Sequence, residues 1–304
     1  MSDTLLKFLF KTAPVRGEIV NLADTWREMT EHHAYPPAVT RLLGEMVAAA
    51  PLLAATIKFN GALILQVHGD GPVKLMVVEV HPDMTIRATA KLRDDVSIAA
   101  DASMTELINA SGKGRCAITL DPKDRLPGQQ PYQGVVSLEG ESIAAVLEAY
   151  MRQSEQLDTR LWLTADNRAA AGMLLQKMPG TGGTSAEAAD PDAWNRLQIL
   201  AQTVKPEELS ALSPAEVMRR LFWQEDPQAS DPVTPRFACS CSRERIGNML
   251  QSLGRAEVDS IIVELGAVHV TCDFCNRQYE FDAVDAEQLF AAGSTALPNT
   301  ELRH

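Results

Sequence analysis

The sequence predicts an α+β fold, made of a large N-terminal α+β domain, a helical linker and a small C-terminal zinc-binding domain. Three observations lead to this prediction. Short β-branched runs mix with helical patterns up to about residue 180, small and acidic residues interrupt the pattern at 180–185, and four of the five cysteines lie between Cys239 and Cys275. Sequential hairpins with helices between them are typical of α+β layers, not of doubly wound sheets.

Length and composition fit two modest cores and a connector. The chain has 304 residues, of which 45% are hydrophobic and 22% are charged, as is usual for globular proteins. We expect four segments: an α+β core domain over 1–180, a helical linker over 181–232, a zinc-binding domain over 233–290 and a tail over 291–304.

Within the first domain the clearest pattern is a hairpin. Residues 63–67 and 75–78 are strand-like, and 69–72 between them form a turn, because glycine permits positive φ and proline presets the exit. Two further strands are expected at 132–138 and 160–164, and a helix with one apolar face at 142–154.

Two helix starts mark the linker. Asp190-Pro191 precedes one apolar stripe, and Ser213-Pro214-Ala215-Glu216 is a capping box with proline at the first helical position. Both stripes need a surface that covers them. Such a linker can dock on a neighbouring surface or be released from it.

The C-terminal domain is predicted to be a helix pair followed by a hairpin. Ser242 can cap the first helix, while Gly254 and Gly266 end the two helices. Val268 and Val270 alternate into Cys272, and a second strand follows Cys275. This block is too small to be stable without a staple.

The four clustered cysteines predict a metal site. Cys239 and Cys241 form a Cys-x-Cys pair, and Cys272 and Cys275 form a Cys-x-x-Cys pair thirty residues farther on. Zinc takes four thiolates in a tetrahedron, which closes the site to substrate. A purely structural zinc is one interpretation, and an iron centre is possible with the same ligands. The tight Cys-x-Cys spacing also suits local disulfides once a metal is lost.

Several motifs resemble the heat-shock protein 33 family of redox-regulated holdase chaperones. The strongest are the runs FACSCSRER (237–245) and CDFC (272–275). Weaker matches extend the resemblance over nearly the whole chain: VRGE (15–18), LLAATIKFNG (52–61), GDGP (69–72), YQGVV (132–136), LEG (138–140), SEQL (154–157), TRL (159–161) and AGMLLQ (171–176).

The resemblance implies that the 233–290 domain is a redox switch. The reduced protein with one zinc ion would be inactive, and oxidation to Cys239–Cys241 and Cys272–Cys275 disulfides would activate it to bind unfolding client proteins and prevent their aggregation under oxidative and heat stress. It also implies a homodimer in the oxidised state and transfer of clients to other chaperones for refolding.

The energetics of the metal fit such a switch. Zinc contributes roughly 10–16 kcal/mol to the folding of zinc-finger peptides, whereas a whole domain is stable by about 5–15 kcal/mol. Two disulfides across one or two residues constrain the unfolded chain little and cannot replace the metal. Oxidation should therefore unfold the domain and expose an apolar surface.

Charge and composition argue against nucleic-acid-binding, secreted and membrane-spanning proteins. The net charge of −12 argues against nucleic acid. The N-terminus has no secretory pattern, and the apolar run 42–57 is too short and too interrupted for a bilayer, so we expect a cytoplasmic protein with a buried core helix there. No spacing indicates an enzyme active site, and Cys116 is expected to be a buried small hydrophobe.

Two alternative functions use the same cysteines. One is a zinc-ribbon docking module, which the acidic composition of the C-terminal domain disfavours for phosphate binding. The other is a thiol-disulfide oxidoreductase using Cys272 and Cys275, although such motifs normally stand after a strand at the start of a helix.

Overall fold

The computed structural model describes residues 3–11, 13–57, 59–94, 96–124, 128–179, 190 and 192–293. The chain divides into two compact units, Met1–Ala238 and Cys239–His304, called here the N-terminal unit and the C-terminal unit. The composition break predicted as a domain boundary at 180–185 lies outside the described residues, as does most of the predicted tail.

The N-terminal unit contains two mostly antiparallel sheets. The first sheet has the order β10-β1-β2-β9-β8, with β1 (Thr4–Phe10), β2 (Val15–Leu22), β8 (Thr159–Ala165), β9 (Ala170–Lys177) and β10 (Pro227–Ala229). The second sheet has the order β11-β5-β4-β3-β6-β7, with β3 (Gly61–His68), β4 (Val73–Val80), β5 (Thr85–Leu92), β6 (Arg115–Pro122), β7 (Tyr132–Ser137) and β11 (Arg236–Phe237), which pairs parallel to β5.

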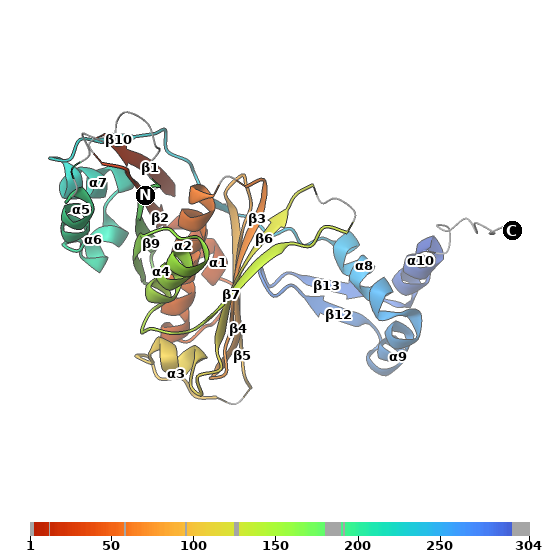
Figure 1. Ribbon diagram of the computed structural model, residues 1–304. Coiled ribbons are helices and arrows are strands. Elements are labelled where there is room, and N and C mark those ends of the chain that lie inside the picture. The colour runs from red at the N-terminus through yellow and green to blue at the C-terminus, as the bar shows by residue number, and fades with distance from the viewer. Residues whose placement is uncertain are drawn as a thin grey trace, which may run out of the picture. The chain divides into compact units, whose positions relative to one another are not determined.

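A long apolar helix, α2 (Pro37–Thr56), fills the space between the two sheets (Figure 1). It contacts strands of both sheets, and its side chains form the centre of the larger core. By length and hydropathy it could span a bilayer, but 72% of its apolar window is buried inside the protein. The core helix predicted from the run 42–57 is therefore confirmed.

Three shorter helices complete this part of the unit: α1 (Asp24–Thr30), α3 (Met104–Ile108) and α4 (Ile143–Ser154). The predicted hairpin is confirmed, because β3 and β4 pair with Leu65 opposite Val78. The predicted helix at 142–154 is also confirmed. Ser142 caps α4 by accepting a hydrogen bond from the Ala145 amide at 3.2 Å.

The predicted linker helices pack on the first sheet. They are α5 (Ala193–Ala201) and α7 (Pro214–Phe222), and the predicted Ser213/Glu216 capping box is present. A short helix that was not predicted, α6 (Pro206–Ala211), lies between them. Their apolar stripes bury against β1, β2 and β9 on the sheet face opposite to α2. At the centre of this second core the Phe222 ring lies 5.8 Å from Phe8 and 5.2 Å from Phe10, between ring centroids.

The C-terminal unit contains α8 (Arg243–Leu253), α9 (Arg255–Leu265), β12 (Val268–Thr271), β13 (Gln278–Phe281) and α10 (Ala283–Gly293). The predicted helix pair and hairpin are confirmed, and Gly254 and Gly266 adopt positive φ at the helix ends. Helix α10 was not predicted. The core of this unit has five buried apolar residues: Leu250, Val258, Val268, Phe281 and Ala286.

Candidate metal centre

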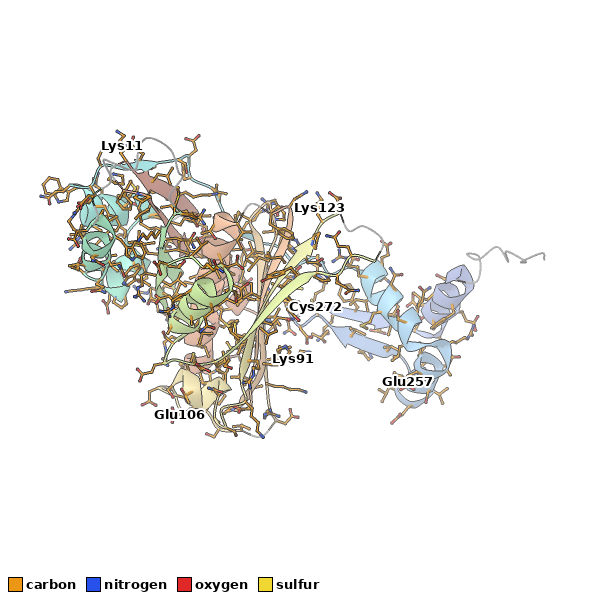
Figure 2. All side chains as sticks on the ribbon, viewed as in Figure 1. Lys11, Lys91, Glu106, Lys123, Glu257 and Cys272 are labelled. Atoms are coloured by element: carbon orange, nitrogen blue, oxygen red, sulfur yellow. The ribbon has the colours of Figure 1, made fainter. Side chains whose placement is uncertain are left out.

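All four predicted ligands come together in the C-terminal unit. Cys239 and Cys241 lie in the loop before α8, Cys272 follows β12 directly (Figure 2), and Cys275 lies in the turn before β13. The two pairs therefore reach one point from two loops that are far apart in the sequence. No sulfur in the cluster is more than 4.8 Å from another.

Local hydrogen bonds hold each loop in shape. Ser242 caps α8 by accepting from the Arg245 amide at 3.2 Å, and the Arg245 guanidinium donates to the Ser240 hydroxyl at 2.7 Å. In the second loop the Cys272 amide donates to the Arg277 carbonyl, and the Asn276 amide donates to the Cys272 carbonyl, both at 2.9 Å. Asn276 takes a φ of 55°, which asparagine tolerates in tight turns.

The sulfur spacing fits a tetrahedral metal. The Cys239 and Cys272 sulfurs are 3.6 Å apart, and the Cys241 and Cys275 sulfurs are 3.4 Å apart. Four sulfurs on a zinc ion with bonds of about 2.3 Å would lie roughly 3.8 Å from one another. A metal ion can therefore be bound here with little movement. The donor set of four thiols suits zinc, which would hold all four as thiolates.

Interactions among the thiols already favour one thiolate. Burial raises the pKa of Cys239 to about 12. Burial also opposes ionisation of Cys241, but hydrogen bonds from Tyr279 and from the neighbouring thiols outweigh it and lower the pKa of Cys241 to about 7. Cys241 is thus the sulfur on which this environment best stabilises negative charge.

Tyr279 is a residue of the site that the sequence did not single out. Its hydroxyl donates to the Cys241 sulfur at 3.1 Å. Tyr279 and Phe281 alternate along β13, and both side chains are more buried than their neighbours Gln278 and Glu280. The contact with Cys241 depends on tertiary structure, so spacing alone gave no signal for it.

Arg243 ties the cysteine loop to the rest of the unit. Its guanidinium donates to the Glu280 carbonyl at 2.8 Å, pairs with Asp285 at 2.7 Å and lies 4.3 Å from the centre of the Phe281 ring. These contacts join the start of α8 to β13 and α10. None of these three contacts involves a cysteine sulfur.

Two other residues that could in principle bind a metal, His269 and Cys116, lie outside the cluster. His269 is exposed on β12 and reaches Glu280 at 4.0 Å. Cys116 is 1% exposed within β6 of the N-terminal unit, and burial raises the pKa of its thiol to about 12. Its predicted role as a buried small hydrophobe is confirmed.

The Cys-x-x-Cys pair does not have the geometry that favours an oxidoreductase. Cys272 and Cys275 occupy the turn of the β12–β13 hairpin, not the start of a helix. They also lie against a second cysteine pair, which oxidoreductase motifs normally lack. The arrangement is that of a closed metal site.

Comparison with known proteins agrees with this architecture. The chain is 48% identical to a 33 kDa chaperonin of Methylobacillus flagellatus, over all of this chain and 99% of the relative. It is 46% identical to one of Chromobacterium violaceum, over 95% and 94% of the two chains. The crystal structure of the 33 kDa chaperonin from Thermotoga maritima has the same fold, with a TM-score of 0.78 and 20% identity over 96% of this chain and 99% of that one.

These names support a chaperone, and the resemblance noted in the motifs is confirmed. The model of the family described as Hsp33 protein matches residues 3–282, which takes in both sheets, the linker helices and the four cysteines. The chain belongs to the Hsp33 family.

Proposed function

We propose that the protein is a redox-regulated holdase chaperone. Reduced, it holds one zinc ion on Cys239, Cys241, Cys272 and Cys275 and is inactive. Oxidised, it loses the zinc and binds unfolding proteins, which prevents their aggregation during oxidative and heat stress. One observation carries the proposal: four sulfurs within 4.8 Å of one another lie in a unit whose core cluster, among the described residues, has five buried apolar side chains.

The energetic argument is that the metal dominates the stability of this unit. A zinc ion in a small domain supplies roughly 10–16 kcal/mol of folding free energy. The five buried side chains of the core cluster supply about 1.5–3 kcal/mol each, and the cost of ordering the chain offsets most of that gain. Loss of the zinc should therefore unfold the C-terminal unit.

Oxidation removes the ligands by forming disulfides. In each pair two thiolates lose two electrons to one peroxide molecule, which takes up protons and becomes two molecules of water. The family resemblance supports the pairs Cys239–Cys241 and Cys272–Cys275. The nearest sulfurs here are the cross pairs, at 3.4 and 3.6 Å, so local pairing requires the two loops to separate once the zinc leaves.

The client surface is proposed to lie beneath the linker helices. When α5–α7 detach, the apolar side chains that they cover on the first sheet become exposed, among them Phe8, Phe10 and Ile19. A newly exposed apolar patch of this kind binds unfolded chains. The stripes of the released helices add to it, and a holdase needs no catalytic turnover.

Partners and compartment follow from the family resemblance. We expect a homodimer in the oxidised state, and transfer of clients to other chaperones for refolding. The cytoplasm is the expected compartment, because thiols stay reduced there until oxidative stress. Neither nucleic acid nor a membrane is an expected partner.

The test is a peroxide titration of the full chain at mildly elevated temperature. Zinc release, free thiols and suppression of aggregation of a heat-unfolding client enzyme are followed together. We expect one zinc released, four thiols lost and one retained, with suppression rising in step. A Cys116→Ser control should release zinc and suppress aggregation at the same dose but retain no thiol. Mapping of the disulfides by mass spectrometry decides between local and cross pairs. Zinc-free oxidised protein that leaves client aggregation unchanged would contradict the proposal.

A further inference from the structure

The Val15-Arg16-Gly17-Glu18 motif has no part in the cysteine chemistry, yet Arg16, Gly17 and Glu18 line a groove in the N-terminal unit. The groove has a volume of about 590 Å³ and is lined by Lys7, Arg16 and Glu18, by Ala55 at the end of α2 and by the segment 228–231. Lys7 lies directly opposite Glu18 in the β1–β2 register. Lys7, Arg16, Glu18 and Asp231 are thus four ionisable side chains that line one groove.

Lys7, Arg16 and Glu18 keep unused capacity for hydrogen bonds and ion pairs. Among the described residues, Lys7 has no ion pair, and the Glu18 Oε2 atom is buried without a hydrogen-bond partner although Glu18 is only 2% exposed. Arg16 donates from Nε and Nη2 to the Gln176 side chain, which in turn donates to Thr159 at 2.7 Å. This network fixes the guanidinium and leaves Nη1 available.

The charge balance of the groove favours an anion. Burial raises the pKa of Glu18 to about 8, an effect that Arg16 and Lys7 only partly offset. At neutral pH Glu18 is therefore mostly a neutral acid that can donate a hydrogen bond. The two cations, Lys7 and Arg16, then face one exposed carboxylate, Asp231, and the charge balance of the groove stays positive. A buried acid beside two cations is a good partner for a carboxylate.

An apolar pocket adjoins the groove and shares Lys7 and Ala55 with it. This pocket has a volume of about 160 Å³, and its apolar wall includes Ile57, Phe59, Leu63, Val80, Met84 and Leu120. It lies between the two sheets at the end of α2. Small-molecule sites typically combine an apolar pocket with a few polar groups at its mouth.

We propose that the groove and the pocket together bind a small amphipathic carboxylate, with its carboxylate between Lys7 and Arg16 and its apolar tail in the pocket beside α2. Glu18 donates its acid proton to a carboxylate oxygen. The site lies entirely in the N-terminal unit and does not depend on the cysteines or on the proposed redox switch.

Octanoate is the probe, added below its micellar concentration to the reduced, zinc-loaded full chain. Calorimetry should detect saturable binding, and the melting temperature of the N-terminal unit should rise with ligand concentration. Lys7→Met should weaken binding about tenfold, because it removes a charge-assisted hydrogen bond. Octylamine, which has the same tail and the opposite charge, should bind at least tenfold more weakly than octanoate.

Two further variants complete the test. Ala54→Leu fills the apolar pocket and should abolish binding, whereas Lys74→Met removes an exposed lysine of β4 that lines neither cavity and should leave the affinity unchanged. If Ala54→Leu does not fold, Lys7→Met and octylamine still decide. The proposal is overturned if octanoate does not bind, or if Lys7→Met binds octanoate as tightly as the unmodified chain.

Discussion

Among single residues, Tyr279 gives the most direct test of how the protein tunes its sulfurs. The phenol donates to the Cys241 sulfur at 3.1 Å, and a hydrogen bond to a thiolate lowers its reactivity toward an oxidant. Tyr279→Phe removes a bond worth about 0.5–1.5 kcal/mol. We expect zinc release by peroxide to become roughly two- to tenfold faster, as measured with a chromogenic zinc chelator.

A matched control for that variant is available in the other unit. Tyr132→Phe makes the same chemical change on β7, where the side chain is 52% exposed, and should leave the rate of zinc release unchanged. An unchanged rate in Tyr279→Phe would mean that access of the oxidant, not the hydrogen bond, limits oxidation of the cluster.

The same residues show how far the sequence could predict the site. Residue type and spacing were enough for the four cysteines, because thiolates are strong metal ligands and each pair lies within one loop. Tyr279 could not be assigned in this way. Its hydroxyl reaches Cys241 only because the β12–β13 register and the loop before α8 meet in space.

Among helices and strands, the packing of α7 on the first sheet is the contact that keeps the linker helices docked. Phe222 is fully buried between Phe8 and Phe10. Phe222→Ala should cost about 3–5 kcal/mol of docking free energy. We expect faster proteolysis within α5–α7 and, under the proposed function, suppression of client aggregation at a lower dose of peroxide.

The neighbouring residue provides the control. Trp223 follows Phe222 directly but is 69% exposed, so Trp223→Ala removes a large aromatic side chain without opening the core. Its proteolysis and its oxidant dose should match those of the unmodified chain. Equal effects of the two variants would indicate that loss of an aromatic residue at the end of α7, and not undocking, is responsible.

The helices and strands also differ in how well the sequence predicted them. Helices α5 and α7 could be predicted from their start signals, and α7 begins with the expected capping box. Helix α6 has only six residues and β1 is a nearly continuous apolar run, so neither shows a clear periodicity of apolar residues along the sequence. The sequence also could not show that β1, β2 and β9 cover the linker stripes, because that pairing is long-range.

For the molecule as a whole, the apolar core is divided unevenly. The N-terminal unit has α2 between two sheets and a second core under the linker helices. The described part of the C-terminal unit has one core cluster with five buried apolar residues, beside the cysteine cluster. We therefore expect the C-terminal unit to unfold under conditions in which the N-terminal unit stays folded.

Removal of the metal under reducing conditions tests this difference without any oxidation. A strong zinc chelator should unfold the C-terminal unit, because its small core cannot replace the roughly 10–16 kcal/mol that zinc supplies. Hydrogen exchange read by mass spectrometry should show loss of protection in α8, α9, β12 and β13, while β3, β4 and β6 stay protected. If the reduced protein kept its protection in α8 and β12 after losing zinc, the apolar core alone would be enough to keep the C-terminal unit folded. Zinc would then not be what stabilises this unit, and the proposed switch would lose its basis.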